Sequence, residues 1–463
     1  MNEREAVEAL QARGRFGVRL GLGRTRALLA ALGDPHLRMR GALIAGTNGK
    51  GSVQALVSAA LLEAGLRVGQ TPKPHLVSYR ERIAVAGVPI SGDDFGAVVE
   101  EVLAAADGLP VRLGPPTEFE IVTAAAFTWF ARSSVDVAVV EVGLGGRLDA
   151  TNTWDGGVAA ITNVDLDHME WLGPTVPLIA REKAAIIKRG DLAVTGADGA
   201  ALEVIQAAAR RVGAPLEITA PLPVTSIGRG GIVVRDFALG DLSVGLIGRH
   251  QSANAAVALG VLRALDRRAI AHPGEDAIRR GFAAARWPGR MELLAVDERG
   301  RASPAAIDGA APGIVEVLLD GAHNVAGAAA LATTLDDLRG SLPAGRATLL
   351  FGALADKQLD RIVEALAPSS ALRAALVIAT TVPDTPRALP ADEIAAAWRR
   401  ASHAGGPAAG MEVETVHSAD DALARALELG RARGGPVVVA GSLYLVGHVR
   451  GKLMPDARPA SAA

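Results

Sequence analysis

The sequence predicts an α/β protein with a parallel sheet in each of two blocks. In both blocks, short apolar runs alternate with segments of helical periodicity, which is the pattern of parallel strands covered by helices. The chain has 463 residues, enough for two or three domains. A hydrophobic fraction of 49% supports large cores. We therefore expect two α/β domains in succession.

The first block begins with GALIAG (41–46), a short predicted strand. The next segment, SVQALVSAALLEAG (52–65), has its apolar residues at helical spacing and ends at Gly65. Further strands are predicted at 135–142, 157–164 and 191–197, and helices at 118–132, 177–188 and 201–212. Residues 215–247 have the pattern of short strands and turns, and a helix is predicted over 252–268.

The second block predicts strands at 313–320, 347–353, 374–382, 411–416 and 436–442, with helical segments between them. The turn WPGR (287–290) and the polar stretch 297–313 before this block are interpreted as a domain hinge. The prediction is an N-terminal domain over 1–286 and a C-terminal domain over 287–463. The last residues, PDARPASAA (455–463), are predicted to be a disordered tail.

Composition argues against several classes of partner. The formal net charge of -2 gives no electrostatic case for a nucleic acid or a membrane surface. No run approaches the roughly 18 apolar residues of a membrane helix, and MNEREAVEAL lacks the apolar region of a signal peptide. The absence of cysteine excludes disulfides and thiolate metal sites. A cytoplasmic location is expected.

The stretch GALIAGTNGKGS (41–52) predicts an anion site, because a glycine-rich turn joins a strand to a helix expected near Ser52. Backbone N–H groups and the helix N-terminus would hold phosphate there. Lys50 would contact the β- and γ-phosphates, and the Ser52 hydroxyl would reach Mg²⁺. The common pattern G-x-x-x-x-G-K-[ST] is not met, because Ile44 and Gly51 occupy two of its positions. The alternative is an ordinary strand–turn–helix with an exposed lysine.

Three polar side chains of the first block are candidates for a metal site. Glu141, near the end of an apolar strand in EVGLGGRLDATN (141–152), needs either a metal or a salt bridge if it is buried. His168 follows a strand end and is either a metal ligand or structural. Lys183 lies in an apolar helical segment. It either snorkels to a neighbour such as Glu182 or reacts with CO₂ as a desolvated amine, giving a carbamate ligand.

The second block places further polar groups at strand ends. Asp320 and His323 lie in VLLDGAHN (317–324) and would face the first domain, and Arg290 of WPGR could reach a phosphate from the other side. Ser442 lies in AGSLYLVG (440–447), another strand-to-helix turn. Each is weak alone, because Asp or Ser at a strand end often caps a helix. Neither G-x-S-x-G nor H-E-x-x-H occurs, so a hydrolase lacks support.

Taken in order, these stretches resemble the folylpolyglutamate synthase and dihydrofolate synthase family, part of the ATP-dependent amide ligases that include the Mur ligases. The resemblance covers nearly the whole chain. Its specificity lies in the number of strings found in family order: LGLGRTRALLAALG (20–33), GTNGKGS, PHLVSYRERI (74–83), PTEFEIVTAAAF (116–127), EVGLGGRLDATN, LDH, IAREKAAI, RHQSAN (249–254), WPGR, DGAHN and GSLYLVG.

The resemblance implies a three-layer ATP-binding domain of the P-loop type joined to a smaller Rossmann-like domain, with ATP in the cleft. It implies that ATP phosphorylates a folate-type carboxylate and that the α-amino group of L-glutamate attacks the acyl phosphate. Positive charge must gather where the carboxylate meets the γ-phosphate, and Lys50, Mg²⁺ and Arg290 would supply it.

The resemblance also implies site residues, by motif position. ATP would contact Gly46, Thr47, Asn48, Gly49, Lys50, Gly51, Ser52, Asn254, Arg290 and Asp320. The folate or dihydropteroate pocket would comprise Thr117, Glu118, Phe119, Leu148, Asp149 and Ala150, with His323 and Ser442 on the glutamate side. One Mg²⁺ would bind Ser52 and Glu141, and a second would bind His168 and carbamylated Lys183. Lys50, His168, Lys183 and Arg290 would be catalytic.

Two departures from the family stand out. The mobile loop of the family usually reads Ser-Pro-His-Leu, with the serine near the first Mg²⁺, whereas this chain has Lys73, Pro74, His75 and Leu76. An ammonium cannot coordinate a cation. The hypothesis is that Lys73 contacts ATP phosphate directly, or that water replaces the serine on the metal. The second departure is Lys357-Gln358 in place of Lys-Asp, which puts the role of an acid there in doubt.

The sequence thus predicts a monomeric, cytoplasmic ligase for dihydropteroate, tetrahydrofolates and L-glutamate, using ATP and two Mg²⁺ ions. A need for K⁺ stays open. The first alternative is a folylpolyglutamate synthase without the dihydrofolate synthase activity. The second is a Mur-type peptide ligase, disfavoured because only about 40 residues precede GALIAG. The third is a nucleotide-dependent switch, disfavoured because a switch needs no second metal site.

Overall fold

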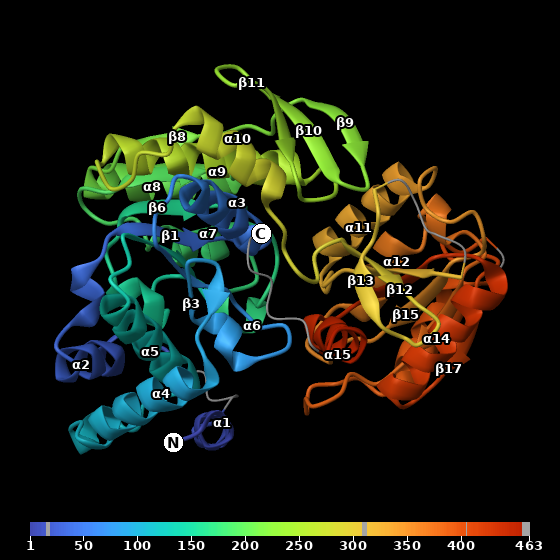
Figure 1. The fold of residues 1–463 in the computed structure, drawn as a ribbon, viewed down its shortest axis with the longest axis horizontal. Coiled ribbons are helices and arrows are strands. Elements are labelled where there is room, and N and C mark those ends of the chain that lie inside the picture. Colours follow the sequence, from blue (N-terminus) through green and yellow to red (C-terminus); the bar gives the residue numbers. More distant parts are fainter. Residues whose placement is uncertain (15–18, 308–312, 404, 456–463) are drawn as a thin grey trace.

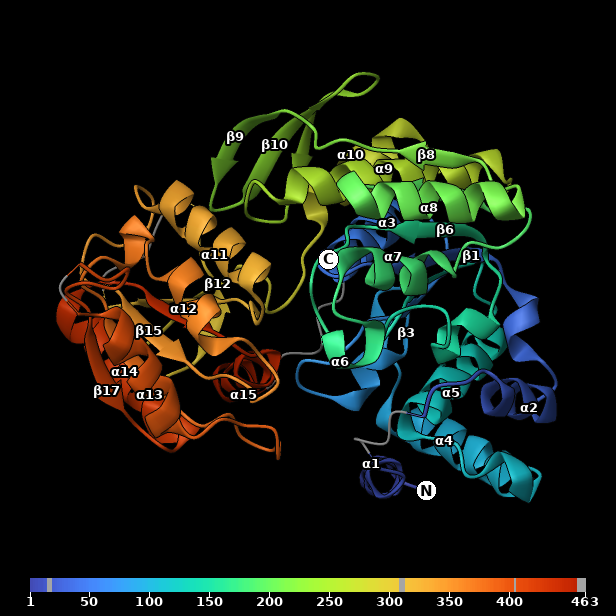
Figure 2. The same cartoon turned by 180° about the vertical axis from the view of Figure 1, so that it is seen from behind.

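The computed structural model describes residues 1–14, 19–307, 313–403 and 405–455. Two α/β bodies lie side by side, one built from the N-terminal part of the chain and one from the C-terminal part (Figures 1 and 2). The predicted tail, beyond Pro455, lies outside the described residues. Every helix in the described part of the chain is too short or too polar to span a bilayer.

An eight-stranded sheet forms the middle layer of the N-terminal body. Its order is β4-β3-β2-β5-β1-β6-β7-β8, parallel from β2 to β8, with β3 and β4 antiparallel at one edge. The strands are β1 (Gly41–Ala45), β2 (Val68–Thr71), β3 (Ala84–Val85), β4 (Val88–Pro89), β5 (Val137–Glu141), β6 (Gly157–Ile161), β7 (Leu192–Thr195) and β8 (Leu216–Ile218).

Helices cover both faces of this sheet, so the N-terminal body has three layers. One core includes α1 (Glu3–Ala12), α2 (Gly23–Ala31), α4 (Gly92–Asp107), α5 (Glu118–Arg132), α7 (Val176–Ala184) and α8 (Gly199–Val212). The other includes α3 (Lys50–Glu63), α9 (Gln251–Arg267), α10 (Glu275–Ala284) and an antiparallel sheet of β9 (Val224–Gly228), β10 (Gly231–Asp236) and β11 (Gly240–Val244). Strand β1 alternates between them: Leu43 and Ala45 face the first core, Ala42 and Ile44 the second.

The C-terminal body contains a seven-stranded sheet of order β13-β12-β14-β18-β15-β16-β17. The strands are β12 (Glu292–Val296), β13 (Ala302–Pro304), β14 (Val315–Leu319), β15 (Thr348–Phe351), β16 (Leu376–Ala379), β17 (Glu412–Thr415) and β18 (Val437–Ala440). Helices α11 (Val325–Leu338), α12 (Leu359–Leu366) and α13 (Ala391–Ala401) pack on one face, and α14 (Ala419–Arg433) and α15 (Leu443–Leu453) on the other. The sheet is parallel from β14 to β17.

The predicted α/β class is confirmed, and two local predictions need correction. Residues 302–304 form β13, which pairs with β12 inside the C-terminal sheet, so the hinge cannot extend through the polar stretch. The chain passes between the bodies in the short link between Ala284 and Glu292, and a boundary after residue 286 stays a proposal. The helix predicted over 177–188 ends at Ala184: the chain turns there, and Lys188 Nζ donates to Trp154 O at 2.8 Å.

One buried ion pair fastens the two bodies together. Arg229, in the turn between β9 and β10, pairs through both terminal nitrogens with Glu316 of β14. It also donates to Ala306 O and Ser341 O. The β9–β11 sheet leans toward α11 in both views (Figures 1 and 2). The Arg229–Glu316 pair therefore helps to fix the orientation of the two bodies.

Candidate active site

A cavity of about 730 Å³ is lined by side chains of both bodies. The carboxyl ends of β1 and β5 open into it from the N-terminal body, and the segments after β14 and β18 close it from the C-terminal body. Its lining includes these predicted site residues: Gly46, Thr47, Asn48, Gly49, Lys50, Gly51, Ser52, Lys73, Pro74, Thr117, Phe119, Glu141, Leu148, Asp149, Ala150, His168, Lys183, Asn254, Arg290, Asp320, His323 and Ser442. Glu118 and His75 are outside the lining.

The loop after β1 has the geometry of an anion site. Gly49 is the N-cap of α3 with φ of 81°, and no side chain caps the first turn, which leaves backbone N–H groups free for a ligand. The segment after β6 holds this loop through two hydrogen bonds: Thr162 Oγ1 donates to Asn48 O at 2.6 Å, and Asn163 Oδ1 accepts from Asn48 N at 2.8 Å. The helix begins at Lys50, two residues earlier than expected.

Gly51 explains why the loop departs from the usual phosphate-loop pattern. A Cβ at this position would lie 2.7 Å from the Trp287 indole nitrogen. Trp287 is the first residue of WPGR, in the link between the two bodies. Serine or threonine directly after the lysine would displace this ring, so the hydroxyl stands one residue later, at Ser52, which lines the cavity.

Two lysines converge on one carbonyl at the loop. Lys50 Nζ donates to Gly46 O and Thr47 O, both at 3.1 Å, and Lys183 Nζ donates to Gly46 O at 2.8 Å. Burial, together with the nearby charge of Lys50, lowers the pKa of Lys183 to about 7. Burial also lowers the pKa of Lys50. The structure therefore presents two close amino groups to a ligand, and an anion between them would favour their charged forms.

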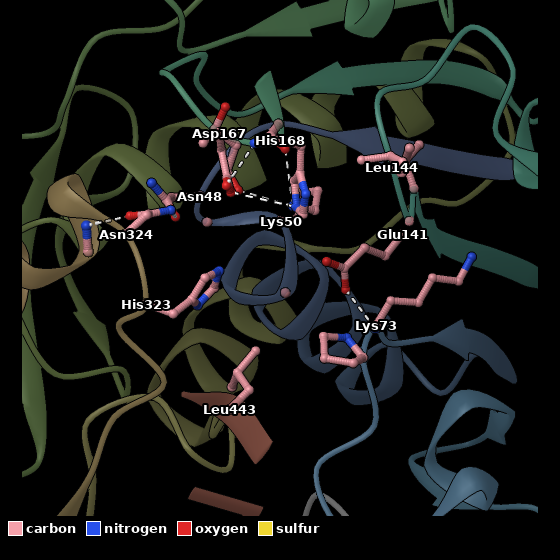
Figure 3. Close-up of a pocket in the computed structure, with 18 of the residues that line it drawn as sticks. Asn48, Lys50, Lys73, Glu141, Leu144, Asp167, His168, His323, Asn324 and Leu443 are labelled. Carbon is pink, nitrogen blue, oxygen red and sulfur yellow. Dashed lines mark hydrogen bonds and ion pairs between the residues drawn. The ribbon is translucent and has the colours of Figure 1, made fainter. Parts of the chain in front are cut away.

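Glu141, at the end of β5, is the buried carboxylate on the opposite side of this cluster. It is 2% exposed, and burial raises its pKa, although Lys50 opposes the shift. Its Oε2 accepts from the backbone N–H of Lys73 at 3.1 Å (Figure 3). Within the described ranges, no three His, Asp or Glu side chains gather as a metal site by themselves. One carboxylate completed by substrate phosphates is nevertheless a usual Mg²⁺ site, so the residues fit this ion.

Asp167 is a site residue that the sequence analysis missed, although it stands in the LDH string beside His168. Its Oδ1 lies 3.0 Å from Lys357 Nζ of the C-terminal body. Burial would raise the pKa of Asp167, but His168, Lys357 and His323 outweigh it and hold the pKa well below its usual range. Burial lowers the pKa of His168, which keeps the imidazole neutral and able to bind a metal.

The structure shows what Lys357 and Gln358, the second departure from the family, contact. Lys357 uses its ammonium to reach Asp167 across the cavity, and Asp356 lies 3.6 Å from the same nitrogen. Gln358 instead accepts from Arg361 of its own helix at 3.0 Å. In this chain, the acidic sequence neighbour of Lys357 is therefore Asp356, which precedes it, and not the residue that follows it.

The C-terminal wall carries Asp320, His323 and Asn324. Both carboxylate oxygens of Asp320 accept backbone N–H groups, from Met291 at 2.9 Å and Ala322 at 2.8 Å, so Asp320 fastens the link between the bodies. His323 Nδ1 bonds with Gly321 O at 2.7 Å, and burial lowers its pKa to about 4. Asn324 donates to Asn48 Oδ1 at 3.1 Å, a second bridge across the cavity (Figure 3).

Arg290 and Asn254 complete the nucleotide side. Asn254 donates to Gln251 Oε1 at 2.8 Å and lies against Gly49, where a Cβ would come within 2.1 Å of Asn254 Oδ1. The charge of Arg290 lowers the pKa of Lys50 and of His323. Lys50, at the start of α3, and Arg290, in the link between the bodies, therefore both bring positive charge to the loop.

The expected acceptor pocket lies beside the loop and differs from prediction at Glu118. Phe119 lines the cavity, and Asp149 holds the 143–151 loop by accepting from Gly143, Leu144 and Thr151 N–H groups. Glu118 is buried away from the cavity, 3.7 Å from Arg82, which itself lines the cavity. His75 likewise sits behind Arg82 and accepts from its Nε at 2.8 Å.

The position of the Lys73 side chain does not support the hypothesis that it contacts ATP phosphate directly. Its side chain extends away from Lys50 and the loop (Figure 3), and its Nζ lies 4.4 Å from the centroid of the Phe119 ring. The nitrogen is buried without a hydrogen-bond partner among the described residues. Burial lowers the pKa of Lys73 to about 8. Lys73, where the resemblance leads us to expect serine, thus directs its ammonium at Phe119, on the side where the acceptor is expected.

The fold and the cavity define an ATP-dependent ligase of the Mur type, and sequence comparisons agree. Residues 44–262 match the Mur ligase middle domain, and residues 300–443 match the glutamate ligase domain of Mur ligases. The chain is 33% identical to the dihydrofolate synthase/folylpolyglutamate synthase of Bacillus subtilis (strain 168), over 97% of this chain and 98% of the relative. It is 34% identical to the folylpolyglutamate synthase of Lacticaseibacillus casei, over 98% and 99%.

Solved structures give the same result. Mycobacterium tuberculosis folylpolyglutamate synthase complexed with ADP and AMPPCP is similar with a TM-score of 0.80 and 34% identity, over 97% of this chain and 99% of that one. E. coli FolC in complex with DHPP and ADP is similar with a TM-score of 0.78 and 28% identity, over 97% of each chain. The chain belongs to the dihydrofolate synthase/folylpolyglutamate synthase family.

Proposed function

We propose that the protein is an ATP-dependent amide ligase that adds L-glutamate to dihydropteroate and to tetrahydrofolates. The observation that carries the proposal is the single continuous cavity. It joins the glycine-rich loop, the Phe119 side of the N-terminal body and the His323 and Ser442 side of the C-terminal body. A ligase needs its nucleotide, carboxylate and amine within one enclosed space, because the acyl phosphate must meet the amine before water does.

In the proposed reaction, a carboxylate oxygen of the acceptor attacks the γ-phosphorus, and the bond to the β–γ bridging oxygen breaks. ADP leaves with that electron pair. The neutral α-amino group of glutamate then attacks the acyl carbon, and phosphate leaves from the tetrahedral intermediate as the amine loses a proton. Lys50 and Arg290 stabilise the negative charge that develops in the first step.

The metal sites are part of this proposal. Ser52 and Glu141 would hold one Mg²⁺ with the nucleotide, and His168 and Lys183 would hold a second. Bound Mg²⁺ supplies charge neutralisation on the phosphates. Carbamylation of Lys183 is supported by its lowered pKa, since the neutral amine is the form that reacts with CO₂. A carbamate would also replace the repulsion between Lys183 and Lys50 by attraction.

We propose that the acceptor binds at the N-terminal wall of the cavity and glutamate at the C-terminal wall. Thr117, Phe119 and the 148–150 segment would bind the pterin end of the acceptor, and His323 and Ser442 would bind glutamate. Gly46 to Ser52, Asn254 and Arg290 would bind ATP, with Asp320 holding the link that carries Arg290. We propose that the enzyme acts as a monomer. We place the enzyme in the cytoplasm.

The proposal is tested by supplying ATP, Mg²⁺ and labelled glutamate with dihydropteroate or tetrahydrofolate in turn, and measuring ADP and ligated product. We expect product from both acceptors. Product from tetrahydrofolate alone would leave a folylpolyglutamate synthase, and no product from either would reject the proposal. Replacing K⁺ by Na⁺ in the same assay tests a monovalent cation. A Lys50→Met variant should lose activity, and a Lys452→Met variant, far from the cavity in an ion pair with Asp420, should keep it.

A further inference from the structure

The C-terminal wall of the cavity holds an arginine that no role described above uses. Arg387 precedes α13 and lines the cavity together with Tyr444, the second residue of α15. Its backbone is fixed independently of its side chain, because Arg387 O accepts from Ala355 N at 2.8 Å. The side chain is 39% exposed. The guanidinium is therefore available to a ligand in the cavity.

The guanidinium is poorly satisfied by the protein. Its contacts among the described residues are long: Nη1 lies 3.5 Å from Asp356 Oδ1, Nη2 lies 3.5 Å from the Tyr444 hydroxyl, and Cζ lies 6.0 Å from the centroid of the Tyr444 ring. Its Nε is buried and has no hydrogen-bond partner in the described part of the chain. A guanidinium has five N–H donors in a planar fork that matches a carboxylate. The donors thus lack the acceptor for which their geometry is suited.

The surrounding charges leave room for an anion. Asp356 is shared between Arg387 and Lys357, while Lys357 is bound more closely by Asp167, at 3.0 Å. Arg290 brings a further positive charge to the same cavity. Ser442 is the N-cap of α15, and its Oγ accepts from the Tyr444 N–H at 3.2 Å. Arg387 therefore stands next to the expected glutamate side of the site.

We propose that Arg387, supported by Tyr444, binds a carboxylate of a glutamate residue in the cavity and so acts as a specificity-determining residue. The proposal rests on the proposed function. Two glutamates can supply this carboxylate: the incoming substrate, and the glutamate already attached to a folate acceptor. The two acceptors separate the sources, because dihydropteroate carries no glutamate and tetrahydrofolate does.

The test is steady-state kinetics of Arg387→Met with both acceptors, measuring the KM of ATP, glutamate and acceptor separately. Loss of one charge-assisted pair should raise the affected KM about 10- to 100-fold. A higher glutamate KM with both acceptors would assign Arg387 to the incoming amino acid. A higher tetrahydrofolate KM, with dihydropteroate unchanged, would assign it to the attached glutamate. Either result supports the proposal.

The controls keep the proposal falsifiable. Arg387→Lys keeps the charge without the fork and should give an intermediate KM, and it serves as the second variant if the methionine variant folds poorly by circular dichroism. Arg399→Met, which removes an arginine of α13 that donates to Thr415 of β17, should change no KM. Unchanged glutamate and acceptor KM values, or a change confined to ATP or to kcat, would overturn the proposal. Absence of product with the unaltered enzyme would instead reject the proposed function.

Discussion

The buried pair of Arg229 and Glu316 offers a direct test of how the two bodies are held together. The side chains are 4% and 0% exposed, and Arg229 also donates to two carbonyls. Arg229→Met would leave the Glu316 carboxylate buried without its partner. Removal of one member of such a pair costs about 3–5 kcal/mol. We expect the free energy of unfolding to fall by that amount.

The assay is urea unfolding followed by circular dichroism and tryptophan fluorescence, with each transition fitted separately because the bodies can unfold in turn. The double variant Arg229→Met/Glu316→Leu should recover more than half of the loss, since it leaves no unpaired charge. Arg249→Met is the matched control: it breaks a partly exposed pair with Asp337, also between the bodies, and should cost under about 1 kcal/mol. A loss of under about 1 kcal/mol for Arg229→Met would refute the reasoning.

Three further predictions concern buried titratable groups. Lys183→Ala should lower kcat at least about 100-fold, with partial recovery in added acetate if the carbamate is the ligand; full activity without acetate would reject it. Lys73→Met should raise the Tm in the absence of substrates, because it removes a buried ammonium that has no hydrogen-bond partner among the described residues; a lower Tm would show that the charge, which faces the Phe119 ring, stabilises the fold. Burial raises the pKa of Asp191 to about 7, with Asp155 adding to the shift, so its contribution to stability is complete below about pH 4 and lost as the pH rises through 7. Asp191→Asn should therefore flatten the dependence of Tm on pH between these values, and an unchanged slope would contradict the assignment.

Local signals in the sequence were enough for the elements that carry the site. The short strand at 41–46 and the helical spacing after Ser52 follow from apolar patterning, which requires no knowledge of distant contacts. The strand end at Glu141 and the turn at Gly49 are also local. Patterning also predicted strand β14 and, at its end, Asp320.

Contacts between distant segments were not predictable in this way. Nothing near Gly51 in the chain indicates that Trp287 packs on it, and nothing near Asp167 indicates the ammonium of Lys357. Polar residues 297–313 resembled a linker because β13 is an exposed edge strand, which can be polar without losing its pairing. The position of Lys73 beside Phe119 depends on the tertiary fold in the same way.

The central claim is that the acceptor carboxylate is activated by phosphorylation in the cavity between the two bodies. The direct measurement uses dihydropteroate with ¹⁸O in its carboxylate, together with ATP, Mg²⁺ and L-glutamate. Because the attacking oxygen leaves with the phosphorus, we predict one ¹⁸O atom in each phosphate released, detected by mass spectrometry. Ligated product accompanied by phosphate free of ¹⁸O would contradict the account.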